Sequence, residues 1–349
     1  MRYFGIFFIL IILGGFVGGW YDIASYHPYR LDYRRAVINL PITYTKYLHN
    51  DTYALGEKYL AEDLAAELKK HGIDTILYTF EDSLPNRNFN EGWEIFMRSG
   101  PELRLDKYHN YADDDRIAVL FETIPYELNI VKNADIVLTG SLKKNKLYRE
   151  MGINSHFLPQ FTRTDKFYPD AKDDLKRQVL FVANQWPDFP VRKTVQYAKE
   201  TGVQIDVFGD NWTNVLVDDA ASWWKARQIP NDQLKYFYSS ADIVLNDTRP
   251  DMIEAGFISN RIFDATACGT LVISDYMPEI EEIYGDAVPM YKNADEFKQL
   301  IDFYLSHPEE RKRKALKAQK ITLERFSADK VIGHMTDILR NYIYEKGLD

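Results

Sequence analysis

The sequence predicts an α/β protein with two doubly wound domains that face each other across a cleft, preceded by one apolar segment. The chain has 349 residues, which is enough for two domains of ordinary size. In both halves, short apolar runs typical of buried parallel strands alternate with helical stretches. A turn-rich connector with a proline near each end, residues 158–174, separates the halves.

The composition is that of an ordinary globular protein. Hydrophobic residues make up 46% of the chain and charged residues 27%, which excludes a disordered, collagen-like or coiled-coil protein. With 43 Lys and Arg against 52 Asp and Glu, the net charge is −9, so we expect no nucleic-acid partner and at most a local anion pocket. The single cysteine, Cys268, excludes an internal disulfide.

The start of the chain predicts a membrane anchor over residues 1–21. Residues 3–20 contain no charge and no proline, and a helix needs roughly 17–25 such residues to cross a bilayer. The basic residues that follow, Arg30, Arg34 and Arg35, predict that the remainder lies in the cytoplasm, as a single-pass protein of the cytoplasmic membrane. The alternatives are a cleaved signal peptide and a buried apolar helix.

The first domain is expected over residues 22–160. Strands are predicted at residues 35–41, 74–80, 116–122 and 134–141, and the apolar spacing of residues 55–70 predicts a helix. The first strand, this helix and the second strand have the length of a right-handed parallel crossover. Residues 85–115 are rich in Asn, Asp, Arg and aromatic residues and predict an irregular stretch with short helices or a functional loop.

A connector at residues 161–177 leads to a second domain at residues 178–330. Its strands are predicted at residues 178–184, 203–210, 241–247, 270–275 and 287–291, with helical stretches such as 192–201 and 232–240 between them. Residues 294–346 are almost entirely helical, and residues 331–349 are predicted to form a C-terminal helix. Because ligands of open α/β sheets bind at the carboxyl ends of the strands, the cleft is the expected site.

Residues 260–275, NRIFDATACGTLVISD, resemble the donor-binding segment of glycosyltransferases with the GT-B fold. Together with FVANQWPDFPVRKTV at 181–195, VFGDNW at 207–212 and YSSADIVLNDTRPDMIEAGFISNR at 238–261, the order is similar to the CgeB-like branch, related to the retaining family-four enzymes. The resemblance covers about residues 134–326. It implies two Rossmann-like domains and transfer of a sugar from a nucleotide-sugar donor to a hydroxyl of a glycan, lipid-linked or other cell-envelope acceptor.

Five polar residues of the second half are predicted to bind the donor. Asp264 suits the ribose diol, because a carboxylate accepts from both hydroxyls, and the resemblance implies the same position, where Glu is usual. An ordinary acidic residue at a helix start is the alternative. Arg192 and Lys193 open a helix and suit the diphosphate, although both can also be solvated. Asn260 and Arg261 stand in the Asn-Arg-x-Phe-Asp context shared with the CgeB-like branch and are predicted to bind phosphate or to orient the motif.

Three glycines complete the prediction for this half. Gly209 ends a strand where the backbone is expected to approach the ligand, and Gly269 permits the turn into the next strand. Gly256 lies eight residues before Asp264, where retaining relatives often carry a first Glu, and the nearby Glu254 is out of register. Whether the stereochemistry is retaining or inverting is therefore open.

The acceptor side offers Asp51 and Glu122 as candidate catalytic bases, since an acceptor hydroxyl needs a carboxylate or His within reach. The resemblance implies no metal and no other cofactor, and the run Asp113 to Asp115 is interpreted as a solvated turn. Motifs for hydride transfer, P-loop hydrolysis, zinc proteases and serine hydrolases are absent, and the seven histidines show no ligand spacing. The alternatives are a noncatalytic scaffold and a nucleotide-sugar epimerase of the same fold.

Overall fold

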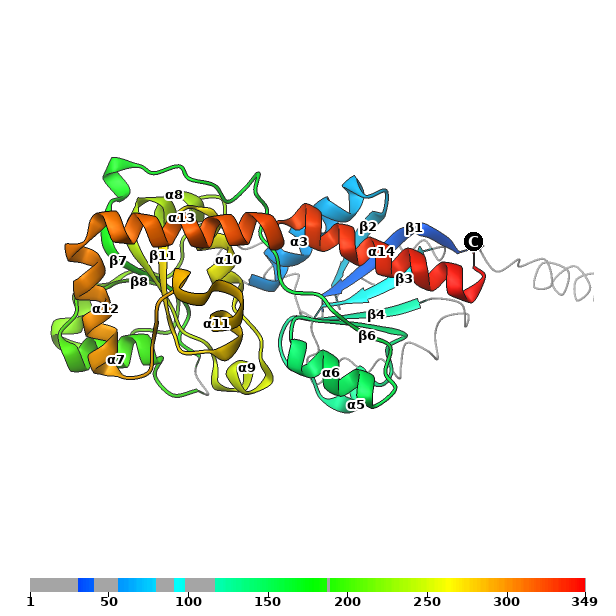
Figure 1. Ribbon diagram of the computed structural model, residues 1–349, viewed down its shortest axis with the longest axis horizontal. Coiled ribbons are helices and arrows are strands. Elements are labelled where there is room, and N and C mark those ends of the chain that lie inside the picture. The colour runs from blue at the N-terminus through cyan, green and yellow to red at the C-terminus, as the bar shows by residue number, and fades with distance from the viewer. Residues whose placement is uncertain (1–30, 41–55, 80–90, 98–116, 187–188, 349) are drawn as a thin grey trace, which may run out of the picture.

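The computed structural model describes residues 31–40, 56–79, 91–97, 117–186 and 189–348. These residues form two α/β domains that lie side by side (Figure 1), so the prediction of two parallel-sheet domains is confirmed. The predicted anchor, Asp51 and the run Asp113 to Asp115 fall outside the described residues. Over the described part of the chain, no helix is both long enough and apolar enough to cross a membrane.

The first domain is built on a six-stranded parallel sheet with the order β2-β1-β3-β4-β5-β6. From β1 the chain first adds β2 on one side and then adds β3 to β6 on the other side, so the topological switch point lies between β1 and β3. Its elements are β1 (Asp32–Leu40), α3 (Gly56–Lys70), β2 (Asp74–Thr79), β3 (Glu91–Phe96), β4 (Ile117–Glu122), α5 (Leu128–Val131), β5 (Ile136–Thr139), α6 (Leu142–Glu150) and β6 (Ser155–Phe157).

Strand β3 corrects the sequence analysis, which predicted an irregular stretch over residues 85–115. All six residues of β3 are buried, and the strand pairs with β1 and β4 in the middle of the sheet. Two of the six are glutamates: Glu91 forms an ion pair with Arg35 at 3.6 Å, and Glu94 accepts a hydrogen bond of 2.9 Å from Asn39 Nδ2. Because charged residues are rarely buried, a central strand is usually recognised by a continuous apolar run. The two glutamates interrupt that run in β3, so the sequence did not indicate a buried strand.

The second domain contains a second six-stranded parallel sheet, with the order β12-β11-β10-β7-β8-β9. Its switch point lies between β7 and β10. Its elements are the 3-10 helix η2 (Asp173–Leu175), β7 (Arg177–Val182), α7 (Lys193–Thr201), β8 (Asp206–Phe208), η3 (Asp218–Trp223), β9 (Trp224–Ala226), α8 (Leu234–Ser240), β10 (Ala241–Asn246), α9 (Pro250–Ala255), α10 (Asn260–Ala267), β11 (Leu271–Asp275), α11 (Pro278–Tyr284), η4 (Gly285–Ala287), β12 (Met290–Tyr291), α12 (Ala294–Ser306) and α13 (Pro308–Arg325).

The last helix, α14 (Ala328–Lys346), returns to the first domain and lies over it (Figure 1). Its apolar residues, such as Ile332 and Met335, pack into the same core as Leu64 of α3. The chain therefore crosses between the domains twice. The two crossings lie side by side, because Thr162 N donates to Phe326 O at 2.9 Å and Ala328 N donates to Thr162 O at 2.8 Å.

Candidate functional site

The carboxyl ends of β7 and β10 meet at the switch point of the second sheet. Arg261, in the first turn of α10, joins the two ends: its Nε donates to Val182 O and its Nη1 donates to Asn246 Oδ1, both at 2.7 Å. The guanidinium is partly buried, and among the described residues no ion pair links it to a carboxylate. The strand ends thus hold a positive charge at the place where open α/β sheets bind their ligands.

The start of α10 adds hydrogen-bond donors beside this charge. Ser259, the N-cap residue, makes no side-chain cap bond, so the first amides of this eight-residue helix have no side-chain acceptor from it. Free amides and the helix dipole both favour an anion at this end. Arg261 and the start of α10 together can therefore bind a phosphate group.

Arg192, which the sequence analysis also listed as a candidate for the diphosphate, occupies a different environment. Its side chain is 4% exposed, its Nη2 lies 2.7 Å from Asp247 Oδ1, and its guanidinium stacks 3.9 Å from the centroid of Trp186. Burial lowers the pKa of Arg192, although the carboxylate of Asp247 opposes this shift. The charge of Arg192 is therefore compensated inside the domain.

Lys193, the first residue of α7, is exposed and faces solvent.

Asp264 is 9% exposed, and both of its oxygens are bonded within the protein. Oδ1 accepts from Thr162 Oγ1 at 2.7 Å, and Oδ2 accepts from Asn260 Nδ2 at 2.9 Å. Burial raises the pKa of Asp264 to about 7, against the effect of the Thr162 hydrogen bond. Asn260 Oδ1 is buried without a hydrogen-bond partner. The carboxylate thus ties the donor-binding segment to the connector between the domains.

Gly209 has a φ of +145°, and a Cβ at this position would lie 1.9 Å from Ala183 O. The sequence analysis expected a close approach to a ligand, but the close neighbour is the backbone that follows β7. Gly209 is therefore required by packing within the domain. Gly269, with a φ of +76°, lies in the turn between α10 and β11 as expected.

Glu122 is the only predicted catalytic carboxylate that the structure describes, and it is fully buried at the end of β4. Its Oε1 accepts from Tyr126 N at 3.1 Å and from Tyr148 Oη at 2.9 Å. Burial raises the pKa of Glu122. A carboxylate enclosed in this way does not reach an acceptor hydroxyl, so the arrangement supports a structural role for Glu122 rather than that of a base.

Sequence reasoning missed Glu279, in the first turn of α11. A Cβ built on Gly256 would lie 2.7 Å from Glu279 Oε1 and 3.1 Å from Ser141 Oγ. The other carboxylate oxygen of Glu279, Oε2, is buried without a hydrogen-bond partner. A carboxylate from another helix therefore stands beside the position where retaining relatives carry their first Glu. No spacing in the sequence connects positions 256 and 279.

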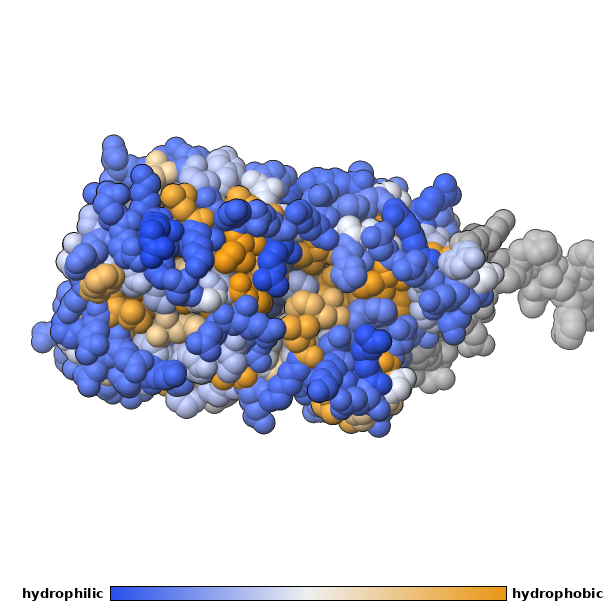
Figure 2. Space-filling view, viewed as in Figure 1, coloured by the Kyte–Doolittle hydropathy of each residue, from blue (hydrophilic) through white to orange (hydrophobic). Residues whose placement is uncertain are grey.

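Glu279 lines a pocket at the junction of the two domains. Gly140 and Leu142 of the first domain and Gly256 and Phe257 of the second also line it. Figure 2 shows hydrophobic side chains gathered along the middle of the visible face, where the domains meet. The junction is therefore mostly apolar, with two carboxylates, Glu279 and Glu282, at its wall.

Comparison with known proteins identifies the second domain. Residues 177–337 match the family model described as glycosyl transferase-like. The second domain is therefore similar to glycosyltransferase-like domains. The chain is also 26% identical over 226 residues to the spore protein CgeB of Bacillus subtilis (strain 168), a match that covers 58% of this chain and 68% of CgeB. The resemblance to CgeB-like GT-B glycosyltransferases is confirmed.

Solved structures extend the likeness to both domains. Sucrose-phosphate synthase from Thermosynechococcus elongatus aligns with a TM-score of 0.66 and 12% identity, over 89% of this chain and 99% of that one. HepE from Anabaena, in complex with UDP and glucose, aligns with a TM-score of 0.65 and 11% identity, over 88% and 99%. At these identities the matches establish the GT-B fold.

Proposed function

We propose that the chain transfers a sugar from a nucleoside diphosphate sugar to an acceptor hydroxyl. The observation that carries the proposal is the position of Arg261. Its side chain bonds to the ends of β7 and β10 at the switch point, and no carboxylate of the described residues forms an ion pair with it. The domain that holds it matches the glycosyl transferase-like family model. HepE, which has the same fold, is known in complex with UDP-glucose. This supports a uridine nucleotide and a hexose as the first donor to try.

In the proposed reaction, the bond between the sugar and the diphosphate breaks as the acceptor oxygen attacks the anomeric carbon, and the proton of the acceptor hydroxyl passes to the departing diphosphate. Negative charge grows on the departing diphosphate, and fixed donors at that position lower the barrier. Arg261, the first amides of α10 and Lys193 supply such charge and hydrogen bonds. We propose that the diphosphate site uses no metal ion, as the resemblance to GT-B enzymes implies.

Asp264 is proposed to accept a hydrogen bond from the ribose, with Asn260 beside it. Its oxygens already accept from Thr162 and Asn260, so the ribose has to share this carboxylate with the connector. Donor binding would then act on a residue that links the domains. Glu279 is proposed to supply, beside the sugar, the carboxylate that Gly256 lacks.

The acceptor and the location are also proposals. An apolar N-terminal segment of 18 residues supports a membrane anchor, and with it a lipid-linked or cell-envelope glycan as acceptor on the cytoplasmic side. The N-terminal segment and the basic residues after it also support the cytoplasmic membrane as the location.

Release of UDP from UDP-glucose, measured with and without acceptor extracts, tests the proposal. A transferase releases UDP faster with acceptor, and this activity persists in EDTA. Glu279→Gln should lower turnover roughly 10- to 100-fold with little change in UDP affinity, because it removes charge near the sugar rather than near the nucleotide. Glu281→Gln, at an exposed position of the same helix outside the pocket lining, is the matched control. UDP binding without turnover indicates a scaffold, and conversion of the sugar without acceptor indicates an epimerase; either outcome contradicts the proposal.

A further inference from the structure

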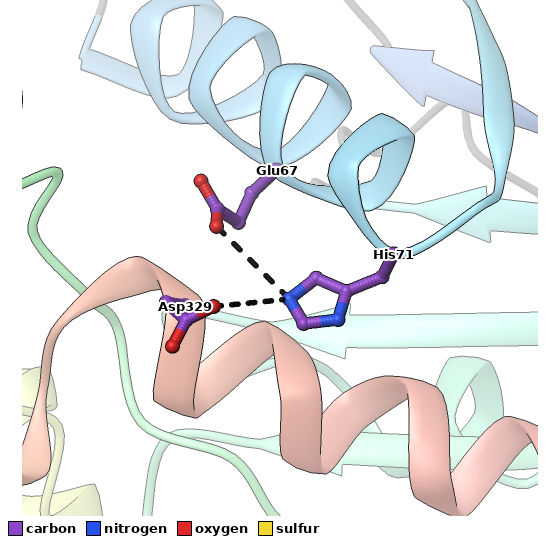
Figure 3. A group of neighbouring side chains, drawn as sticks. All are labelled: Glu67, His71 and Asp329. Atoms are coloured by element: carbon purple, nitrogen blue, oxygen red, sulfur yellow. Dashed lines mark ion pairs between the residues drawn. The ribbon is translucent and has the colours of Figure 1, made fainter.

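A second polar cluster lies between α3 and α14 (Figure 3). Glu67 and His71 are four residues apart at the end of α3 and so share one face of the helix, while Asp329 belongs to the first turn of α14. The three side chains point toward one another. His71 Nε2 lies 4.0 Å from Glu67 Oε1 and 3.7 Å from Asp329 Oδ1.

Two facing atoms of this cluster are buried and unsatisfied. Glu67 is 2% exposed, and neither its Oε1 nor His71 Nε2 has a hydrogen-bond partner. The 4.0 Å between them is too long for a direct hydrogen bond. Burying a carboxylate oxygen without a hydrogen-bond partner costs folding free energy. A positively charged group between Glu67 Oε1 and His71 Nε2 would remove this cost.

The rest of Glu67 is arranged to keep Oε1 directed at His71. The opposite oxygen, Oε2, accepts a hydrogen bond of 2.8 Å from Lys70 Nζ. Contacts of this kind orient ligating carboxylates in metal sites. The Asp329 side chain is 81% exposed and can move toward an ion without rearrangement of the core.

We propose that Glu67, His71 and Asp329 bind one zinc ion. An imidazole nitrogen with two carboxylate oxygens suits Zn²⁺, whereas Mg²⁺ and Ca²⁺ prefer oxygen ligands alone. Zinc bonds to these atoms are about 2.0–2.2 Å, which places neighbouring ligands about 3.4 Å apart in a tetrahedron. The three ligand atoms already lie within 4.8 Å of one another, and water completes the coordination from the exposed side.

The zinc ion joins two elements that are distant in the sequence. Asp329 follows the point where the chain crosses back to the first domain, and α3 belongs to the core that α14 completes. The ion thus fixes the start of α14 on the first domain. The cluster shares no residue with the proposed donor site, so the zinc proposal and the transferase proposal succeed or fail independently.

Metal binding by the full chain tests this proposal. After removal of metal with EDTA, we expect equilibrium dialysis to find one Zn²⁺ per chain, and the melting temperature to rise by several degrees with Zn²⁺ but not with Mg²⁺. Asp329→Asn and His71→Gln should each weaken zinc binding at least tenfold. Asp329 is exposed, so its variant is expected to fold even where the His71 variant does not.

The matched controls are Asp337→Asn and His334→Gln, both on α14, which should bind zinc as the unaltered chain does. A visible spectrum typical of tetrahedral Co²⁺, present in the unaltered chain and lost with Asp329→Asn, would support the assigned ligands. The absence of stoichiometric zinc, or equal loss in the variants and their controls, would overturn the proposal.

Discussion

The switch points of the two sheets have the same place in the topology but different chemistry. Between β1 and β3 of the first domain, Asn39 and Glu94 bond to each other inside the sheet, and both are buried. Between β7 and β10 of the second domain, Arg261 bridges the strand ends and keeps its charge free of carboxylates, as far as the described residues show. The parallel topology therefore gives each domain a switch point where a ligand can bind at the carboxyl ends of the strands. The side chains at these strand ends determine which of the two switch points attracts an anion.

The same comparison separates two arginines of the second domain. Arg192 and Arg261 both lie near the ends of β7 and β10, yet only Arg192 is paired with a buried carboxylate, Asp247. We therefore assign Arg192 to stability and Arg261 to donor binding. Substitutions at the two positions should have different consequences.

Arg192→Ala should have the largest effect on stability. It leaves Asp247 buried without its cation, and breaking such a pair costs about 3–5 kcal/mol. Urea denaturation should show this decrease in the free energy of unfolding. Arg313→Ala, at an exposed position of α13, is the control and should change it by less than about 0.5 kcal/mol. A fully stable Arg192→Ala protein would contradict the structural assignment.

Asp264→Asn should alter both the pH dependence of stability and donor affinity. Because burial raises the folded-state pKa of Asp264 to about 7, above that of the unfolded chain, this group lowers stability as the pH rises from about 4 to about 7. The amide of the variant does not ionise, so this pH dependence is removed. If the Asn260 side chain flips, its unpartnered Oδ1 can accept a hydrogen bond from the new amide group. Loss of the charged acceptor should weaken nucleotide binding about tenfold or more.

Denaturation of the unaltered and Asp264→Asn chains at several pH values checks the first effect. Asp275, whose pKa burial also raises to about 7, contributes a similar slope in both chains and serves as an internal reference. Identical slopes in the two chains would contradict the assigned protonation of Asp264. Unchanged nucleotide affinity would move the ribose site elsewhere.

Asn39→Ala should have a smaller effect, confined to stability. It removes the hydrogen bond to Glu94 in the first switch point, at a cost of about 1–3 kcal/mol. Nucleotide affinity should not change, because no donor binding is assigned to this switch point. Asn129→Ala, at an exposed position of α5, is the control for the denaturation measurement. A loss of nucleotide affinity with Asn39→Ala would contradict the distinction between the two switch points.

Much of the fold was predictable because the central strands carry continuous apolar runs. Strands β4 and β10 were predicted for this reason, and both are buried as expected. Strand β3 was missed because Glu91 and Glu94 interrupt its apolar pattern. Helix α14 was predicted as a helix, but its packing on the first domain depends on contacts with α3, more than 250 residues earlier, which no local pattern contains.

The site was less predictable, since the sequence reports residue types but not their partners. The sequence analysis listed both Arg192 and Arg261 as candidates for the donor phosphates, and Asp247, which lies 55 residues after Arg192, distinguishes them. Glu122 looked like an accessible carboxylate until its enclosure by Tyr126 and Tyr148 was known. Long-range pairing of charges thus limits inference from motifs.

The most direct test of the central claim is the affinity of the folded Arg261→Ala chain for UDP, measured by calorimetry beside the unaltered chain and Arg313→Ala. Loss of a charge-assisted contact to phosphate should weaken binding roughly 10- to 150-fold, and Arg313→Ala should bind as the unaltered chain does. Arg261→Lys, which keeps the charge but not the fork of donors, should lie between them. UDP affinity within twofold of the unaltered chain in a folded Arg261→Ala protein would contradict the account.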